Sequence, residues 1–203
     1  MNSLLARIVA SPALHSRWLN TLSYLENSGA RLIAACEHPT LVREEMLKHA
    51  AEEFRHAYHL KQQMAKLPYP VSPNYALTSL LGGMATLHYL PRLNLFAARH
   101  YRREAYLLVT YAIELRASAL YPLYDAVLRA HSSRVIVRSI LLEEEEHLEE
   151  MRQGLSRLPA GFAAAAVVCA YEKRLYTAWQ ATIFQELTPC EQKAPSVTLS
   201  CLA

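Results

Sequence analysis

Apolar residues recur at intervals of three and four along almost the whole chain, and this spacing constrains the fold more than any other feature. In residues 12–36 the repeat consists of Leu14, Trp18, Leu22, Leu25, Leu32 and Ile33. Such a repeat places an apolar stripe along one face of a helix. The chain also has only 5 glycines in 203 residues, so few positions suit tight turns. The sequence therefore predicts an all-α protein and argues against β-barrels and glycine-loop nucleotide folds.

Prolines and glycines divide this pattern into five predicted helices. The helices span about residues 12–36, 40–67, 96–130, 132–158 and 162–187. Residues 68–95 contain several prolines and a Gly-Gly pair, which predicts a crossover with a helical turn or two between two helical hairpins. The expected fold is a ferritin-like four-helix bundle with one long crossover plus an additional C-terminal helix. Residues 1–187 would form one domain, and residues 188–203 a flexible C-terminal tail.

Charge and cysteine spacing exclude several classes of protein. The net charge is only +3, and the 21 Lys and Arg residues form no basic block, which argues against a dedicated nucleic-acid-binding protein. The 4 cysteines form no C-x-x-C pair, so a zinc ribbon is excluded and a reducing compartment is weakly favoured. The longest apolar stretch is about half of what a membrane span requires. A cytoplasmic protein without a membrane span is expected.

Two of the predicted helices carry a glutamate followed three residues later by a histidine. One pair is Glu53 and His56, and the other is Glu144 and His147. Residues three apart on a helix share a face, so each pair could bind one metal ion. Either motif alone is a weak signal, because a charged, solvated helix face also contains such pairs by chance.

The first helical hairpin supplies a matching carboxylate. Glu26 lies on an otherwise apolar face near the middle of its helix, where an unpaired carboxylate is costly unless it is ionically paired or binds a metal. Glu26 and Glu53 lie at almost equal distances along the chain on either side of Pro39. In an antiparallel hairpin that turns at Pro39, the two glutamates are therefore expected at the same height.

The second hairpin fits less closely. Glu114 is again an isolated acid in an apolar stretch, but it lies further along the chain from the turn near His131 than Glu144 does on the other side. The mismatch amounts to about 6 Å of helix rise, roughly one helical turn. A kink at Pro122, or an irregular third helix, is expected to absorb it.

One glutamate from each of two helices, with Glu-x-x-His from each of the other two, resembles the ligand set of the ferritin-like di-iron carboxylate superfamily. The resemblance covers about residues 12–158. By that resemblance Glu53 and Glu144 would bridge two iron ions, or two manganese ions, since carboxylate and imidazole ligands suit both metals. Glu26 and His56 would complete one site, and Glu114 and His147 the other. The ligand spacing resembles that of aldehyde-deformylating oxygenases. Residues 52–58 and 113–118 are similar to tRNA hydroxylases that act on methylthio-isopentenyl-adenosine.

Several neighbouring residues are expected to support the ligands or to line a substrate pocket. His59, Tyr111, Arg116 and Tyr121 are candidates for contacts with the ligands, although packing or a surface position explains each of them as well. The apolar residues beside the ligands suggest a pocket for an organic substrate. They are Phe54, Ile113, Leu115, Ile140 and Leu141.

The resemblance implies an oxidoreductase that activates O2 at the metal pair to hydroxylate, as a monooxygenase does, or otherwise oxidise an organic substrate. By the same resemblance a partner would be an electron donor such as a ferredoxin or a reductase. Separately, the apolar face of the helix at 162–187 would either cover the bundle or contact a second copy of the chain in a homodimer. The mildly basic charge permits tRNA as a substrate without indicating it. Two other classes remain open at this point. The first is an iron-handling ferroxidase or peroxide-scavenging protein, and the second is a non-catalytic helical interaction module.

Overall fold

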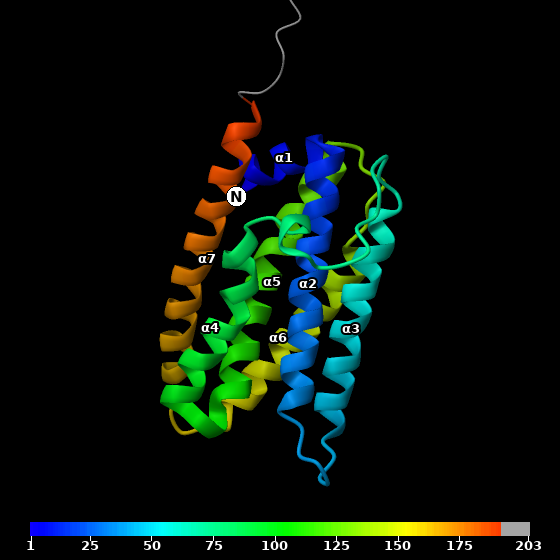
Figure 1. Ribbon diagram of the computed structural model, residues 1–203. Helices are drawn as coiled ribbons and strands as arrows, with labels where there is room; N and C mark the ends of the chain where they lie inside the picture. The colour runs from blue at the N-terminus through cyan, green and yellow to red at the C-terminus, as the bar shows by residue number, and fades with distance from the viewer. Residues whose placement is uncertain (192–203) are drawn as a thin grey trace, which may run out of the picture.

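The structure, a computed structural model, describes residues 1–191 and consists of α-helices joined by short connections (Figure 1). The helices are α1 (Asn2–Ala10), α2 (Pro12–Ala35), α3 (Glu44–Met64), α4 (Gly83–Tyr101), α5 (Ala105–Ala130), α6 (Arg138–Ser156) and α7 (Gly161–Glu191). Short 3-10 helices occupy Leu77–Ser79 and Arg102–Glu104. The described part of the chain contains no β-strand, so the prediction of an all-α protein is confirmed.

Helices α2, α3, α5 and α6 form a four-helix arrangement (Figure 1). Helix α2 is antiparallel to α3, and α5 is antiparallel to α6, whereas α3 and α5 run in the same direction. Helices α3 and α5 are parallel because residues 65–82 and the descending helix α4 return the chain to the lower end of the bundle before α5 begins. Helices α4 and α7 pack on each other and on α5, and α1 covers the upper end.

The crossover contains far more helix than the sequence suggested. Helix α4 starts at Gly82 and Gly83, whose φ angles of 75° and 46° turn the chain into the helix, and continues through Pro91. The third bundle helix therefore begins at Ala105 rather than at residue 96. Between α4 and α5 the chain reverses at Arg102, a non-glycine residue with a φ angle of 30°.

Both ends of the chain also differ from expectation. Residues 2–10 form helix α1, which the sequence analysis did not assign. Helix α7 continues to Glu191, so the beginning of the expected tail is helical. Residues 192–203 of that expected tail lie outside the described residues.

The mismatch in the second hairpin is resolved by the connection at residues 131–137. Glu114 lies in the first half of α5, far from its C-terminal end, whereas Glu144 lies in the second turn of α6. The connection therefore descends beside the end of α5 over about 15 Å before α6 begins. Val135 and Val137 anchor it, since both side chains are buried. The extended connection absorbs the offset, rather than a kink at Pro122.

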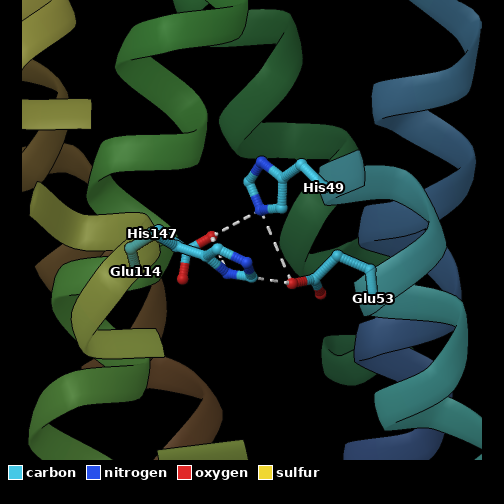
Figure 2. A group of neighbouring side chains, drawn as sticks. All are labelled: His49, Glu53, Glu114 and His147. Carbon is cyan, nitrogen blue, oxygen red and sulfur yellow. Dashed lines mark hydrogen bonds and ion pairs between the residues drawn. The ribbon is translucent and has the colours of Figure 1, made fainter. Parts of the chain in front are cut away.

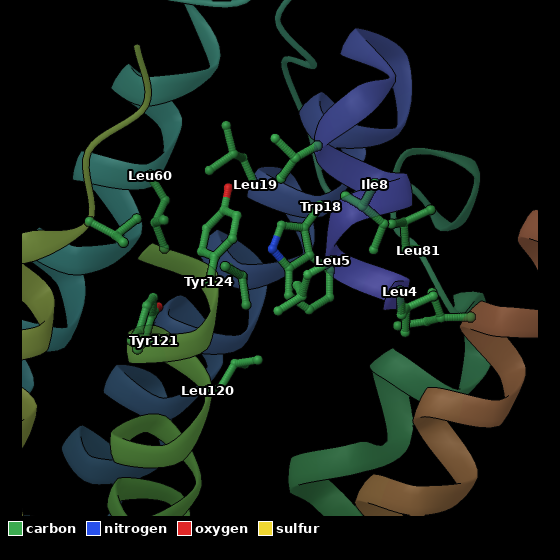
Figure 3. Packing of buried hydrophobic residues seen from close by; sticks show 14 of the residues in the cluster. Leu4, Leu5, Ile8, Trp18, Leu19, Leu60, Leu81, Leu120, Tyr121 and Tyr124 are labelled. Carbon is green, nitrogen blue, oxygen red and sulfur yellow. The ribbon is translucent and has the colours of Figure 1, made fainter. Parts of the chain in front are cut away.

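The largest hydrophobic cluster lies at the upper end of the bundle, where α1, α2, α5 and α7 meet (Figure 3). The fully buried rings of Trp18 and Tyr124 pack edge to face with centroids 6.1 Å apart, and Trp18 stacks on Trp179 at 5.7 Å. Tyr121 belongs to the same cluster and points from it toward the middle of the bundle. This packed end gives the central polar residues a rigid support.

Candidate metal centre

Seven histidine and glutamate side chains converge in the middle of the bundle. They come from α2, α3, α5 and α6 and form two groups, within each of which the candidate ligand atoms all lie within 4.8 Å of one another. The first group is Glu26, Glu53, His56 and Glu144. The second group is His49, Glu53, Glu114 and His147. The structure thus brings together all six residues of the predicted ligand set and adds His49.

Glu53 belongs to both groups. Its Oε1 lies 3.6 Å from His49 Nε2, 3.7 Å from His56 Nδ1 and 3.8 Å from His147 Nδ1. Glu53 therefore offers a carboxylate oxygen to both groups, and its bridging of two metal ions stays a prediction. Glu144 lies in the first group, with Oε1 at 3.2 Å from His56 Nδ1.

His49 is the residue that the sequence analysis missed. It lies one helical turn before Glu53 on α3, and its side chain points into the second group (Figure 2). Its Nε2 is 3.0 Å from Glu114 Oε1, and its ring centroid is 4.3 Å from that of His147. On the far side of the ring, Nδ1 contacts the Tyr106 hydroxyl at 3.4 Å. The spacing of one helical turn from Glu53 to His49 was the available signal.

Two further glutamates, also missed, orient the histidines of the Glu-x-x-His motifs. His56 Nε2 donates to Glu143 Oε2 at 2.8 Å, and His147 Nε2 donates to Glu52 Oε2 at 2.8 Å. Glu52 and Glu143 directly precede Glu53 and Glu144 in the sequence, and each bonds the histidine of the other helix, so the two hydrogen bonds connect α3 and α6 reciprocally. With Nε2 protonated, Nδ1 of each ring is left as the metal-binding nitrogen.

The polar atoms that face the centre lack other partners. In the described residues, eight buried side-chain atoms have no hydrogen bond, and five of them belong to this cluster. They are Glu53 Oε1, His56 Nδ1, Glu114 Oε2, Glu144 Oε1 and His147 Nδ1. Leaving so many buried polar atoms unpaired is costly, whereas a bound cation would satisfy all of them. The donor set of imidazole nitrogens and carboxylate oxygens fits a pair of iron or manganese ions.

Burial and the crowding of carboxylates shift the pKa values of the glutamates in the cluster. Burial, followed by repulsion from neighbouring glutamates, raises the pKa values of Glu26 and Glu144 well above the usual range. Burial also raises the pKa of Glu114. Burial acts to raise the pKa of Glu53 too, but hydrogen bonds from His49 and Glu26 lower it to about 2. Metal ions would therefore displace protons from this site when they bind.

Of the residues predicted to contact the ligands, one does so and the others lie elsewhere. The Tyr121 hydroxyl donates a hydrogen bond to Glu26 Oε1, so Tyr121 does contact a candidate ligand. His59 does not reach the cluster, because the connection at 131–137 covers that end of α3. There His59 Nε2 donates a hydrogen bond to the Ile136 carbonyl oxygen at 2.8 Å. Tyr111 packs instead against the hydrophobic cluster of α4, α5 and α7.

Arg116 pairs with a glutamate of α7 rather than with a candidate ligand. Its Nε and Nη2 donate to the two oxygens of the buried Glu172 at 2.9 and 2.8 Å. The guanidinium also lies 3.8 Å from the ring centroid of Tyr176. These contacts fasten α7 to α5.

An apolar cavity adjoins the cluster between α2, α4 and α5. Glu26, Glu53, Glu114 and Glu144 line its inner end, and most of the remaining wall is apolar. Of the apolar residues expected at a pocket, Ile113 lines this cavity, whereas Phe54 is exposed on the outer face of α3. The cavity therefore extends from an apolar wall to the four glutamates at its inner end.

Comparisons with known proteins give no relative. No family model matches the chain, and no curated protein or solved structure is significantly similar to it. Within residues 1–191, no helix combines the length and the apolar character that a membrane crossing requires.

Proposed function

We propose that this protein is a ferritin-like oxidoreductase that uses a pair of iron ions to activate O2 and oxidise an organic substrate. The observation that carries the proposal is the buried cluster itself, in which Glu53 belongs to two ligand groups whose inward atoms have no other partner. A bound pair of reduced iron ions supplies electrons and Lewis acidity for O2 chemistry. Manganese is the alternative metal, because the same ligands suit it.

The chain's own residues would hold and insulate this centre. Glu52 and Glu143 fix the tautomers of His147 and His56, so that both rings present Nδ1 to the metal positions. The Tyr121 hydroxyl donates to Glu26 and orients that carboxylate. Except for the half-buried Glu26, every candidate ligand is at most 6% exposed, which limits access of bulk water.

The cavity supports an oxidation of an organic molecule rather than iron storage. Its apolar wall reaches the carboxylates of both ligand groups, and a storage protein has no need of such a pocket. An electron donor such as a ferredoxin or a reductase would be needed for repeated turnover. A cytoplasmic location and a homodimer are part of this proposal.

Oxygen consumption by iron-loaded protein tests the function. We expect the protein loaded anaerobically with Fe(II) to consume O2 in a single burst of about one O2 per two irons, with repeated turnover only when reductant is supplied. Continued O2 consumption with each addition of Fe(II), and storage of many irons per chain, would identify an iron-handling protein instead. Absence of any O2 consumption by the loaded protein would contradict the proposal.

A further inference from the structure

The apolar cavity adjoins a second cavity, lined by several charged residues, at the lower end of the bundle. Cys36, Asn94 and Tyr106 line both cavities, so these three residues mark the junction between them. The polar cavity lies where α3 and α5 begin and where α4 and α6 end. From Glu114 at the metal cluster to Tyr106 at the junction, α5 rises by about 12 Å.

The inner cavity suits an extended apolar group. Its side wall along α2 consists of Leu25, Leu32 and Ile33, and its opposite wall includes Val109 and Ile113 of α5. A chain that follows this wall from Cys36 would end beside the ligand carboxylates. An apolar group gains free energy by leaving water for such a wall.

The outer cavity is lined by arginines that have no carboxylate partner. Arg102, Arg103 and Arg157 form no ion pair with any described residue, and Arg43 donates only to the Cys36 carbonyl, at 2.9 Å. Three glutamates also line this cavity, namely Glu45, Glu104 and Glu150, and Lys48 pairs with Glu150 at 3.1 Å. Positive charge is therefore in excess at the mouth.

Arg102 adds a second indication. Its backbone has a φ angle of 30°, a conformation that side-chain-bearing residues rarely adopt, and such strain is concentrated at functional sites. The reversal at Arg102 places two consecutive arginines of the 3-10 helix Arg102–Glu104 at the mouth of the cavity.

We propose that the two cavities together bind an anionic amphiphile, a molecule with an extended apolar chain and a phosphate or carboxylate headgroup. The headgroup binds Arg102, Arg103 and Arg157 through charge-assisted hydrogen bonds, and the chain extends past Tyr106 to the carboxylate cluster. The identity of this ligand as the substrate rests on the proposed function. The binding itself does not depend on metal.

Calorimetric titration of the metal-free full-length protein tests the site. The probes are decyl phosphate, decanoate, decanol and decyltrimethylammonium, all below the concentration at which they form micelles. We expect the two anions to bind roughly tenfold more tightly than decanol or the cation, because charged hydrogen bonds at the mouth are available only to them. The tighter of the two anions identifies phosphate or carboxylate as the headgroup.

Two sets of variants locate the ligand. The combined variant Arg102→Gln, Arg103→Gln and Arg157→Gln should remove the preference for anions and leave decanol binding unchanged. Leu32→Trp should weaken binding of every probe, because it fills the inner cavity. The matched control is Arg92→Gln on the exposed face of α4, which lines neither cavity and should bind as wild type.

Three outcomes would overturn this site. They are equal binding of decanol and the anions, a preference for anions that survives the three arginine substitutions, and binding of inorganic phosphate as tight as that of decyl phosphate. The test is separate from that of the proposed function. Binding as described by a protein that consumes no O2 when loaded with iron would leave the site standing and remove the oxidoreductase function. Oxygen consumption by a protein that binds no amphiphile would support the oxidoreductase function and remove the amphiphile site.

Discussion

At the scale of single residues, the direction of a histidine side chain decides its role. His49 and His59 both lie on α3 within a turn of the Glu-x-x-His motif, and the sequence analysis considered only His59. The structure turns His59 toward the Ile136 carbonyl, whereas His49 lies 2% exposed against Glu114 and His147. The second group thus contains two histidines and the first contains one, so the two candidate metal sites differ in the number of carboxylates they offer.

We predict that His49→Leu weakens one of the two metal positions and spares the other. Loss of one imidazole removes a donor from the second group only. We expect a drop of at least about tenfold in affinity at that position, because loss of a residue that only orients a metal-bound histidine already costs about that much. Titration with Co(II), followed by absorbance, resolves the two binding steps. His59→Leu is the matched control and should leave both steps unchanged. Equal weakening of both steps in His49→Leu would contradict this assignment.

At the scale of the helices, two glycines differ in whether the backbone and its surroundings leave room for a side chain. Gly29 lies within α2, and a Cβ added there would meet only Glu53 Oε2, at 3.6 Å. Gly82 begins α4 with a φ angle of 75°, and a Cβ there would lie 3.0 Å from Thr86 Oγ1 and 3.1 Å from Trp179 Nε1. The first position tolerates a side chain, and the second does not.

Substitution by alanine should therefore have opposite effects at the two glycines. Gly29→Ala should stabilise the protein by about 0.5–1 kcal/mol, because alanine loses less conformational freedom in a helix. Gly82→Ala should destabilise it by about 1–2 kcal/mol through the left-handed backbone and the close contacts. Denaturation with urea measures both free energies of unfolding. The same sign for both substitutions would show that the helix assignments around them are wrong.

The elements also show how far the sequence could predict the fold and the site. The nearly equal spacing of Glu26 and Glu53 about Pro39 correctly indicated that they meet, because that hairpin has nearly symmetric arms. Helix α4 was missed because a Gly-Gly pair and Pro91 signal helix breaks, although tertiary packing of Leu90 and Leu93 stabilises a helix there. The descending connection at 131–137 could not be predicted, since it depends on contacts with α3.

At the scale of the whole molecule, the bundle encloses more ionisable groups than it can charge without a cation. The carboxylates with raised pKa values come from α2, α5 and α6. On α3, burial acts to lower the pKa of His56, but the nearby carboxylates of Glu144 and Glu53 raise it to about 9. The metal-free native protein therefore holds protons that the unfolded chain releases.

We predict that the metal-free protein loses stability as the pH rises from 7 to 9. Over this range the unfolded chain has already lost its glutamate and histidine protons, whereas the native protein still binds the proton of His56 at pH 7 and releases it as the pH approaches 9, so the unfolding free energy falls. We expect a loss on the order of 2 kcal/mol and a decrease of several degrees in Tm. Thermal unfolding at pH 7, 8 and 9 measures it. Loading with Mn(II) should flatten the dependence, and an unchanged slope after loading would contradict the role of these groups.

The number of metal ions that each chain binds is the decisive test of the metal centre. The full-length protein is loaded anaerobically with Fe(II), desalted and analysed by elemental mass spectrometry, beside Glu53→Ala at equal helical content by circular dichroism. Two irons per wild-type chain are predicted, with clear loss in Glu53→Ala, because Glu53 belongs to both ligand groups. A wild-type chain that retains no iron, or a Glu53→Ala variant that retains as much as wild type, would contradict the metal centre.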